Sequence, residues 1–253
     1  MIHVTPVCAS GHWRGPAPGR AGQRGIALLI VVILVLVSAL LALWGFRSSL
    51  LNEAVVGNDA DYLRAFEAAQ ALLQDAEQDI NGTRADGRPC EPTDQDAKAC
   101  RAGNDLTAFI DEEQLLTGLI NTLGAESTRC RHGICSKRTG AQDFWSDSTT
   151  MAAMTASGVG ARYGEYTGAA HGAGSDPILA NRAAGEGGWY WVEIMLYDKE
   201  SPGGALITNA VQNKLVLNLR PSFAYRITAI ARGLKPGTQV VLQSTYVRQS
   251  AAD

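Results

Sequence analysis

The dominant pattern in the sequence is an unbroken apolar run near its start. Residues 26–43 read IALLIVVILVLVSALLAL, in which Ser38 is the only polar residue, and Trp-Gly-Phe extends the run to residue 46. Twenty helical residues span about 30 Å, the thickness of the hydrocarbon core of a bilayer. A core helix of a soluble protein would carry a polar stripe, and this segment has none. The pattern therefore predicts a membrane-spanning helix over residues 26–46.

The charges that flank this run predict its orientation. Arg14, Arg20 and Arg24 precede it without an acidic residue, whereas both signs of charge follow it. This asymmetry places the N-terminus in the cytoplasm and the residues after about 47 on the far side of the membrane. A cleaved secretory signal is the alternative. We disfavour it because the run is longer than the usual apolar region, and no small-x-small cleavage site follows before Arg47.

Helical periodicity continues beyond the apolar run. Residues 47–80 are rich in Ala, Leu, Glu, Gln and Arg, which are strong helix formers. Spacings of three and four residues define one apolar stripe, made by Phe66, Ala69, Leu72 or Leu73, Ala76 and Ile80. The polar residues predicted for the other face are Asp61, Arg64, Glu67, Gln74, Asp75, Glu77 and Gln78. We therefore expect one long helix, first apolar and then amphipathic, with Gly45 and Gly57-Asn58 as places of bending or local unwinding.

The rest of the chain, residues 81–253, predicts a globular head. Apolar spacing predicts a short helix or helix pair over 105–123 with Gly124 as its stop, and the Gly-, Ala- and Ser-rich stretch 136–188 predicts irregular loops. Residues 189–197 form a strand pattern, and 222–232 and 238–248 alternate around Gly-Leu-Lys-Pro-Gly, which predicts a hairpin. We expect one face of this sheet to cover the amphipathic helix and the other to face solvent or a neighbouring subunit. The fold class is α+β, a long N-terminal helix packed on an antiparallel sheet.

Four cysteines follow the apolar run, namely Cys90, Cys100, Cys130 and Cys135. An even count on the oxidising side of a membrane indicates disulfides. Pairing nearest neighbours gives Cys90–Cys100 and Cys130–Cys135, but three pairings are possible and the sequence does not choose among them. A four-cysteine zinc site is disfavoured because the spacings lack the C-x2-C knuckles that such sites use.

Composition and motifs exclude several classes of function. Hydrophobic residues make up 46% and charged residues 19%, which rules out a disordered chain, and the net charge of −3 comes without a basic stripe for nucleic acid. No zinc-protease, hydrolase-elbow or phosphate-loop motif occurs, so we expect no catalytic residue, no cofactor and no metal. Asp94 and Asp96 match the first positions of a calcium-binding loop. Lys98 and the lack of a glutamate at the twelfth position of that loop do not fit the pattern.

Three stretches of the sequence carry a family resemblance, namely RGIALLIVVILVLV from Arg24, FRSSLLNEAVVGNDADYLRAFEAAQALLQDAE from Phe46, and YRITAIARGLKPGTQVVLQSTYVR from Tyr225. In this order they resemble the PilX family of minor pilins of type IV pili. The basic segment ending QRG resembles the prepilin signal of type IV pilins and type II secretion pseudopilins. The resemblance implies a leader over 1–25, cleavage between Gly25 and Ile26 by a prepilin peptidase, and methylation of the new N-terminus. A leader of this length is long for that class. A start codon assigned upstream of the true one would explain the extra length.

One position departs from the general pilin pattern. Most pilins carry Glu as the fifth mature residue, where it pairs with the terminal ammonium of a neighbouring subunit, but here that position is Ile30. A carboxylate at mid-membrane costs about 2.5–3.5 kcal/mol, so it is kept only where a partner is available. The absence of Glu therefore favours a position at or near the filament tip. The alternative is a divergent subunit that tolerates Ile at this site.

The resemblance also implies partners and a location. A PilX-like chain would be a structural subunit that waits in the inner membrane with its head in the periplasm, and then helps prime pilus assembly. Its partners would be other minor pilins, the major pilin, a tip adhesin and the inner-membrane assembly platform, in pili that serve twitching motility and cell adhesion. Two alternatives stay open: a tip pseudopilin of a type II secretion system, and a membrane-anchored periplasmic enzyme or binding domain.

Overall fold

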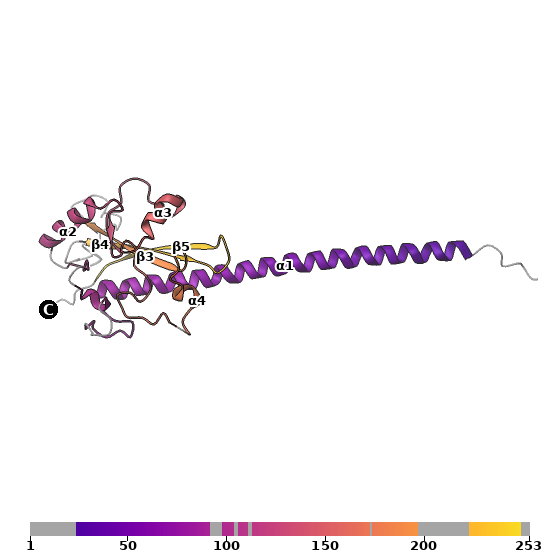
Figure 1. Ribbon diagram of the computed structural model, residues 1–253, viewed down its shortest axis with the longest axis horizontal. Coiled ribbons are helices and arrows are strands. Elements are labelled where there is room, and N and C mark those ends of the chain that lie inside the picture. The colour runs from indigo at the N-terminus through magenta and orange to yellow at the C-terminus, as the bar shows by residue number, and fades with distance from the viewer. Residues whose placement is uncertain are drawn as a thin grey trace, which may run out of the picture. The chain divides into compact units, whose positions relative to one another are not determined.

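The computed structural model describes residues 24–91, 98–103, 106–110, 113–172, 174–196 and 223–248. The chain divides into two units, Met1–Val55 and Val56–Asp253. Helix α1 (Arg24–Asn81) begins in the first unit and ends in the second (Figure 1). It stays helical at Gly45 and at Gly57-Asn58, so the local unwinding expected at these places does not occur. A glycine in a helix costs only about 1 kcal/mol relative to alanine, which is a small cost within a helix of 58 residues.

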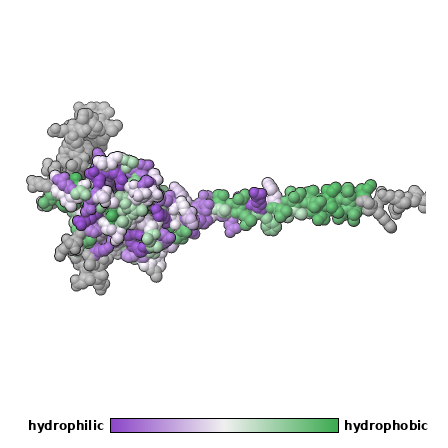
Figure 2. Space-filling view, turned by 45° about the horizontal axis from the view of Figure 1, so that its top comes forward, coloured by the Kyte–Doolittle hydropathy of each residue, from purple (hydrophilic) through white to green (hydrophobic). Residues whose placement is uncertain are grey.

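From Ile26 to Phe46, helix α1 is apolar on every side. All large apolar residues from Ile26 to Phe46 are exposed, and Figure 2 shows the continuous hydrophobic surface that they form. By length and composition, this helix could cross a membrane. An amphipathic helix of a soluble protein would instead bury one stripe against its own chain.

The head contains a five-stranded sheet in the order β1-β2-β3-β4-β5. The strands are β1 (Cys130–Arg131), β2 (Ile134–Ser136), β3 (Gly188–Leu196), β4 (Phe223–Arg232) and β5 (Gln239–Tyr246). Neighbours run antiparallel except β2 and β3, which are parallel, a pairing that needs the long connection between them. The predicted hairpin is confirmed as β4 and β5, whereas β1 and β2 are too short to show an alternating pattern in the sequence.

One face of the sheet packs on the C-terminal part of α1 (Figure 1), as predicted. The helix contributes Ala65, Ala68, Ala69, Leu72, Ala76 and Ile80 to the core, and the sheet contributes Tyr190, Val192, Ile194, Tyr225, Ile227, Ala229, Ala231 and Val240. The four alanines on the helix let the backbone of α1 approach the strands closely, while the bulky side chains come from the sheet. The fold is therefore α+β and pilin-like.

Over β3 and β4 the other face of the sheet is covered by the head itself, so the expectation that it faces solvent or a neighbouring subunit is wrong there, whereas Gln243 and Thr245 of β5 are exposed as expected. Trp189, Trp191 and Ile230 lie in a second buried cluster. The segment from β1 to the end of α3 (Ser148–Met154) covers them with the Cys130–Cys135 disulfide, Phe144, Met151 and Met154. Two tryptophans carry too much apolar area to leave in water, and burying it stabilises this otherwise irregular segment.

The remaining elements are short. Helix α2 (Glu113–Ala125) forms the later part of the predicted 105–123 helix, but it contains Gly124, so this glycine is not its stop. Residues 106–110 are not helical, because the backbone of Thr107 bonds to other side chains instead. The stretch 136–188 is mostly turns, as expected, with α3 and α4 (Pro177–Ala180) capped by the carboxylates of Asp147 and Asp176.

Candidate assembly helix and its anchorage in the head

The predicted processing site lies at the beginning of α1. The helix begins at Arg24, so Gly25 and Ile26 are in its first turn, and the side chain of Ile26 is exposed. Ile30 is 50% exposed, one turn further on. Residues 1–23 of the leader, with Cys8, lie outside the described residues. Cleavage between Gly25 and Ile26 stays a prediction.

The single hydroxyl inside the apolar run is satisfied within the helix. Ser38 donates its Oγ hydrogen to the carbonyl oxygen of Val35 at 2.9 Å. A hydroxyl without a partner would be costly in hydrocarbon, since no water is available there. The apolar part of α1 can therefore be surrounded by lipid or by other apolar helices without an unpaired side-chain hydroxyl.

Asp61 fastens α1 to the turn between β4 and β5. Its carboxylate accepts hydrogen bonds from the backbone N–H groups of Leu234 at 2.9 Å and Lys235 at 3.1 Å. Burial opposes ionisation of Asp61, but hydrogen bonds from Thr238 and from these two N–H groups outweigh it and hold its pKa below the ordinary value. A Cβ on Gly233 would lie 2.3 Å from Oδ2 of Asp61, so this contact requires glycine.

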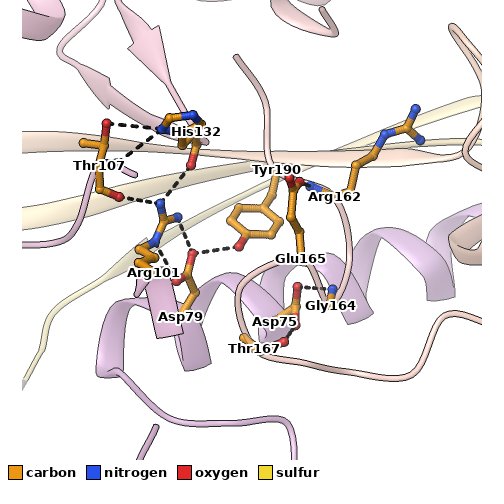
Figure 3. Close-up of polar contacts among 10 residues, drawn as sticks. All are labelled: Asp75, Asp79, Arg101, Thr107, His132, Arg162, Gly164, Glu165, Thr167 and Tyr190. Carbon is orange, nitrogen blue, oxygen red and sulfur yellow. Dashed lines mark hydrogen bonds and ion pairs between the residues drawn. The ribbon is translucent and has the colours of Figure 1, made fainter. Parts of the chain in front are cut away.

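Asp75 fastens α1 to the loop that precedes α4. Its side chain is buried and accepts hydrogen bonds from the backbone N–H of Gly164 at 2.8 Å and from the hydroxyl of Thr167 (Figure 3). Burial raises the pKa of Asp75 to about 6, although the two hydrogen bonds oppose that rise. This carboxyl group thus titrates in the head at a pH well above that of a free aspartate.

Asp79, one turn further along α1, forms a buried ion pair with Arg101. Nε of Arg101 lies 2.8 Å from Oδ1 of Asp79, and Nη2 lies 2.5 Å from Oδ2. The hydroxyl of Tyr190 in β3 donates to the same Oδ2 at 2.7 Å. Nη1 of Arg101 donates to the carbonyl oxygens of Thr107 and His132 (Figure 3). One arginine therefore joins the helix, the segment before α2 and the β1–β2 turn.

The backbone around Arg101 is held in an unfavourable conformation. Cys100 and Arg101 have φ angles of 61° and 52°, in the left-handed region that non-glycine residues rarely adopt. The Cys90–Cys100 disulfide fixes this point of the chain, and the guanidinium lies 3.9 Å from the centroid of the Tyr166 ring. Burial favours neutral Arg101, but the charge and hydrogen bonds of Asp79 outweigh it and raise its pKa above the ordinary value.

The three carboxylates correct the sequence prediction. The sequence pattern predicts Asp61 and Asp75 on the polar face, yet both are buried, and so is Asp79, which the pattern does not mark. Each is buried because it has hydrogen-bond donors from the head, which offset the cost of removing a charge from water. A sequence signal did exist, since Asp75 and Asp79 each directly precede a residue of the apolar stripe, Ala76 and Ile80.

Both disulfides pair nearest neighbours. Cys90 bonds to Cys100, and Cys130 bonds to Cys135 across the β1–β2 pair. The structure thus selects one of the three open pairings, and it leaves none of these four thiolates for zinc. Asp94 and Asp96, the start of the possible calcium loop, lie outside the described residues. Within the described residues, no three His, Cys, Asp or Glu side chains are placed to hold a metal ion.

A long apolar helix whose second half packs on a mainly antiparallel sheet defines the pilin class of fold. Residues 24–74 match the N-terminal domain model of PilX, and residues 131–248 match the C-terminal model of the type IV pilus assembly protein PilX. The chain therefore belongs to the PilX family of minor pilins, which are structural subunits of type IV pili and not enzymes. No curated protein and no solved structure matches the chain.

Proposed function

We propose that this chain primes type IV pilus assembly and sits at or near the tip of the filament. In this proposal, a prepilin peptidase cleaves between Gly25 and Ile26 and methylates the new N-terminus. The processed subunit then joins other minor pilins and a tip adhesin on the inner-membrane assembly platform, and the major pilin is added below them.

The observation that carries the tip position is Ile30. Its exposed side chain lies where most pilins have the glutamate that pairs with a neighbour's terminal ammonium. A subunit with no subunit ahead of it gains nothing from that pairing, whereas a carboxylate would cost about 2.5–3.5 kcal/mol while the helix is in the membrane. An apolar residue at this position is therefore expected for a subunit that enters the filament first.

The apolar surface of α1 supports assembly with other helices. A bilayer core needs about 20 helical residues, which residues 26–46 supply. Exposed apolar side chains nevertheless continue beyond Phe46, at Leu50, Leu51, Val55 and Val56. These side chains would lie beyond the hydrocarbon core, where they need protein neighbours, and the packed helices at the centre of a pilus supply them.

The proposed orientation places the head in the periplasm. Arginines flank the apolar run on the N-terminal side, which favours a cytoplasmic N-terminus. The two disulfides of the head fit an oxidising compartment on the other side of the membrane.

Counting pili separates priming from a role within the shaft. In a strain that lacks this chain, we expect far fewer pili per cell, while the pili that remain keep their normal length. Immunogold labelling of an epitope-tagged chain should mark one end of each pilus. Label along the shaft, or normal numbers of shortened pili, would contradict priming at the tip.

The variant Ile30→Glu tests the reason for the tip position, with Ile33→Glu as a matched control in the same apolar helix. If no partner ammonium faces residue 30, both variants place an unpaired carboxylate in the membrane, and both should lower the amount of this chain in sheared pili to a similar extent. A rise in that amount for Ile30→Glu alone would indicate a subunit within the shaft.

A further inference from the structure

A cleft on the head gathers three arginines. It has a volume of about 750 Å³ and lies between α3, the turns after it, and the loop between α4 and β3. Arg162, Arg182 and Arg232 all line it, and Glu165 is the one carboxylate among its described lining residues. The predicted loop region 136–188 thus contains a cavity large enough to receive a few side chains of another molecule.

The carboxylate of Glu165 already has an ion-pair partner and a hydrogen-bond donor within the head. Its Oε1 is 2.7 Å from Nζ of Lys98. Its Oε2 accepts a hydrogen bond from the backbone N–H of Arg162 at 3.0 Å, and Figure 3 shows these two residues. In the described part of the chain, none of the three arginines forms a side-chain ion pair. The cleft therefore carries an excess of positive charge that the head does not neutralise at this point.

The hydrogen bonds of these arginines go to neutral groups. Arg162 donates to the carbonyl oxygens of Asn181, Ala183 and Glu186, and Arg182 donates to that of Tyr163 at 2.6 Å. These bonds hold the guanidinium groups in place without cancelling their charge. A guanidinium has five N–H donors, so Arg182, which makes one such bond and is exposed, keeps donors for a ligand.

Two of the guanidinium groups are further fixed by an aromatic ring. The guanidinium carbon of Arg162 lies 4.1 Å from the ring centroid of Trp189, and that of Arg232 lies 5.8 Å from it. Trp189 is buried in β3 and cannot move away. Burial and the nearby charge of Arg182 lower the pKa of Arg162 to about 10, and the charge of Glu165 opposes this fall without outweighing it. The site is thus preorganised for an anion.

We propose that this cleft binds carboxylate side chains of a partner protein. Arginine pairs with carboxylates through parallel hydrogen bonds, and these are the strong charge-assisted kind. A nucleic acid is a poorer fit, because the chain as a whole has a net charge of −3 and the aromatic ring in the cleft is buried, which leaves no platform for bases. The proposal rests on the proposed function only in expecting the partner among the pilus assembly proteins.

A titration of the purified full-length chain in detergent micelles tests the site. The probe is a blocked tri-glutamate peptide, compared with tri-glutamine, inorganic phosphate and a short single-stranded DNA. We expect tri-glutamate to bind with an affinity that falls as salt is added, and tri-glutamine not to bind. Absence of tri-glutamate binding, or tighter binding of phosphate or DNA, would overturn the carboxylate assignment.

The variants Arg182→Gln and Arg88→Gln locate the binding. Arg182 is exposed, so its replacement should leave the fold intact, and loss of its charged hydrogen bonds should weaken tri-glutamate binding roughly tenfold. Arg88 has a side chain that is 81% exposed and does not line the cleft, so Arg88→Gln should bind like the wild type. Equal affinity for wild type and Arg182→Gln would overturn the proposal. This binding assay needs no pili, so its result is independent of the priming and tip experiments.

Discussion

Asp79 and Arg101 form a two-bond ion pair at the end of α1, with side chains that are 3% and 4% exposed. The pair connects the helix to the polar segment closed by the Cys90–Cys100 disulfide. Removing both charges from water is expensive, and that cost is offset by the close geometry of the pair, by the hydrogen bond from Tyr190 and by those from Arg101 to two carbonyl oxygens. The pair is therefore sensitive to the loss of either partner.

Replacing Arg101 by Met should destabilise the head severely. It leaves the carboxylate of Asp79 buried without its counter-ion, and we expect the free energy of unfolding to fall by about 3–5 kcal/mol. Urea unfolding of the full-length chain in micelles, followed by tryptophan fluorescence, measures this loss. The double variant Asp79→Asn/Arg101→Met should be more stable than Arg101→Met alone, because no charge is then left buried.

The exposed pair Arg88–Asp86 provides the control for this measurement. Nε of Arg88 lies 3.5 Å from Oδ2 of Asp86, and both side chains are exposed to solvent. Arg88→Met should therefore change the unfolding free energy by less than about 1 kcal/mol. A similar effect of Arg88→Met and Arg101→Met would show that the burial of the Asp79 pair has no energetic consequence.

The Cys90–Cys100 disulfide should act together with Arg101. Replacing both cysteines by Ser should cost about 2–4 kcal/mol, as is typical for a disulfide. Because Cys100 and Arg101 share a left-handed stretch of backbone, losing the disulfide also frees the guanidinium from Asp79. The losses from the double Ser variant and from Arg101→Met should therefore not add, with a coupling of roughly 0.5–3 kcal/mol in a double-mutant cycle. Replacing Cys130 and Cys135 serves as the control pair, and additive losses at Cys90 and Cys100 would contradict this coupling.

The stability of the head should depend on pH through Asp75. Its pKa is about 6 in the folded protein against an ordinary value of 3.8 for an aspartate, so the folded state binds the proton more tightly than the unfolded state. The resulting stabilisation is fully present below pH 3.8 and is lost as pH rises through 6. Relative to Asp75→Asn, the wild type should therefore gain on the order of 1–3 kcal/mol of unfolding free energy between pH 7 and pH 4. A pH dependence that is the same in both proteins would show that Asp75 does not titrate in this way.

Gly233→Ala should break the contact between α1 and the β4–β5 turn. The added methyl group would lie 2.3 Å from Oδ2 of Asp61, so backbone or side chain must move, and we expect a loss of about 1–3 kcal/mol in thermal or urea unfolding. Gly118→Ala is the matched control, because nothing lies within 4 Å of the added atom in helix α2. That control should be neutral or stabilising by up to about 1 kcal/mol.

The sequence predicted the elements that repeat a simple pattern. The apolar run, the alanine-rich stripe and the alternating β4–β5 hairpin all follow from periodicity, because burial imposes the same spacing on the residues that share a face. Ala69 and Leu72 lie in the core as predicted, and Tyr225 and Ile227 of the sheet belong to the same buried cluster.

The contacts that join separate elements could not be predicted in this way. Asp79 and Arg101 are 22 residues apart in the sequence, and their pairing depends on two left-handed residues for which the sequence has no glycine signal. The burial of Trp189 on the outer face depends on a cover from residues that have no regular pattern. In the same way, the arginine cleft joins Arg162, Arg182 and Arg232 from three places in the chain, and only the fold brings them together.

The assignment as a processed pilin subunit is tested most directly by the N-terminal sequence and intact mass of the membrane protein, with and without the prepilin peptidase of the host. We predict a chain that begins at methylated Ile26 only when the peptidase is present. Gly25→Val should block this cleavage, while Gly22→Val, the same change three residues upstream, should not. A chain that keeps its leader in both strains would contradict the processing proposed here and leave an anchored periplasmic domain in its place.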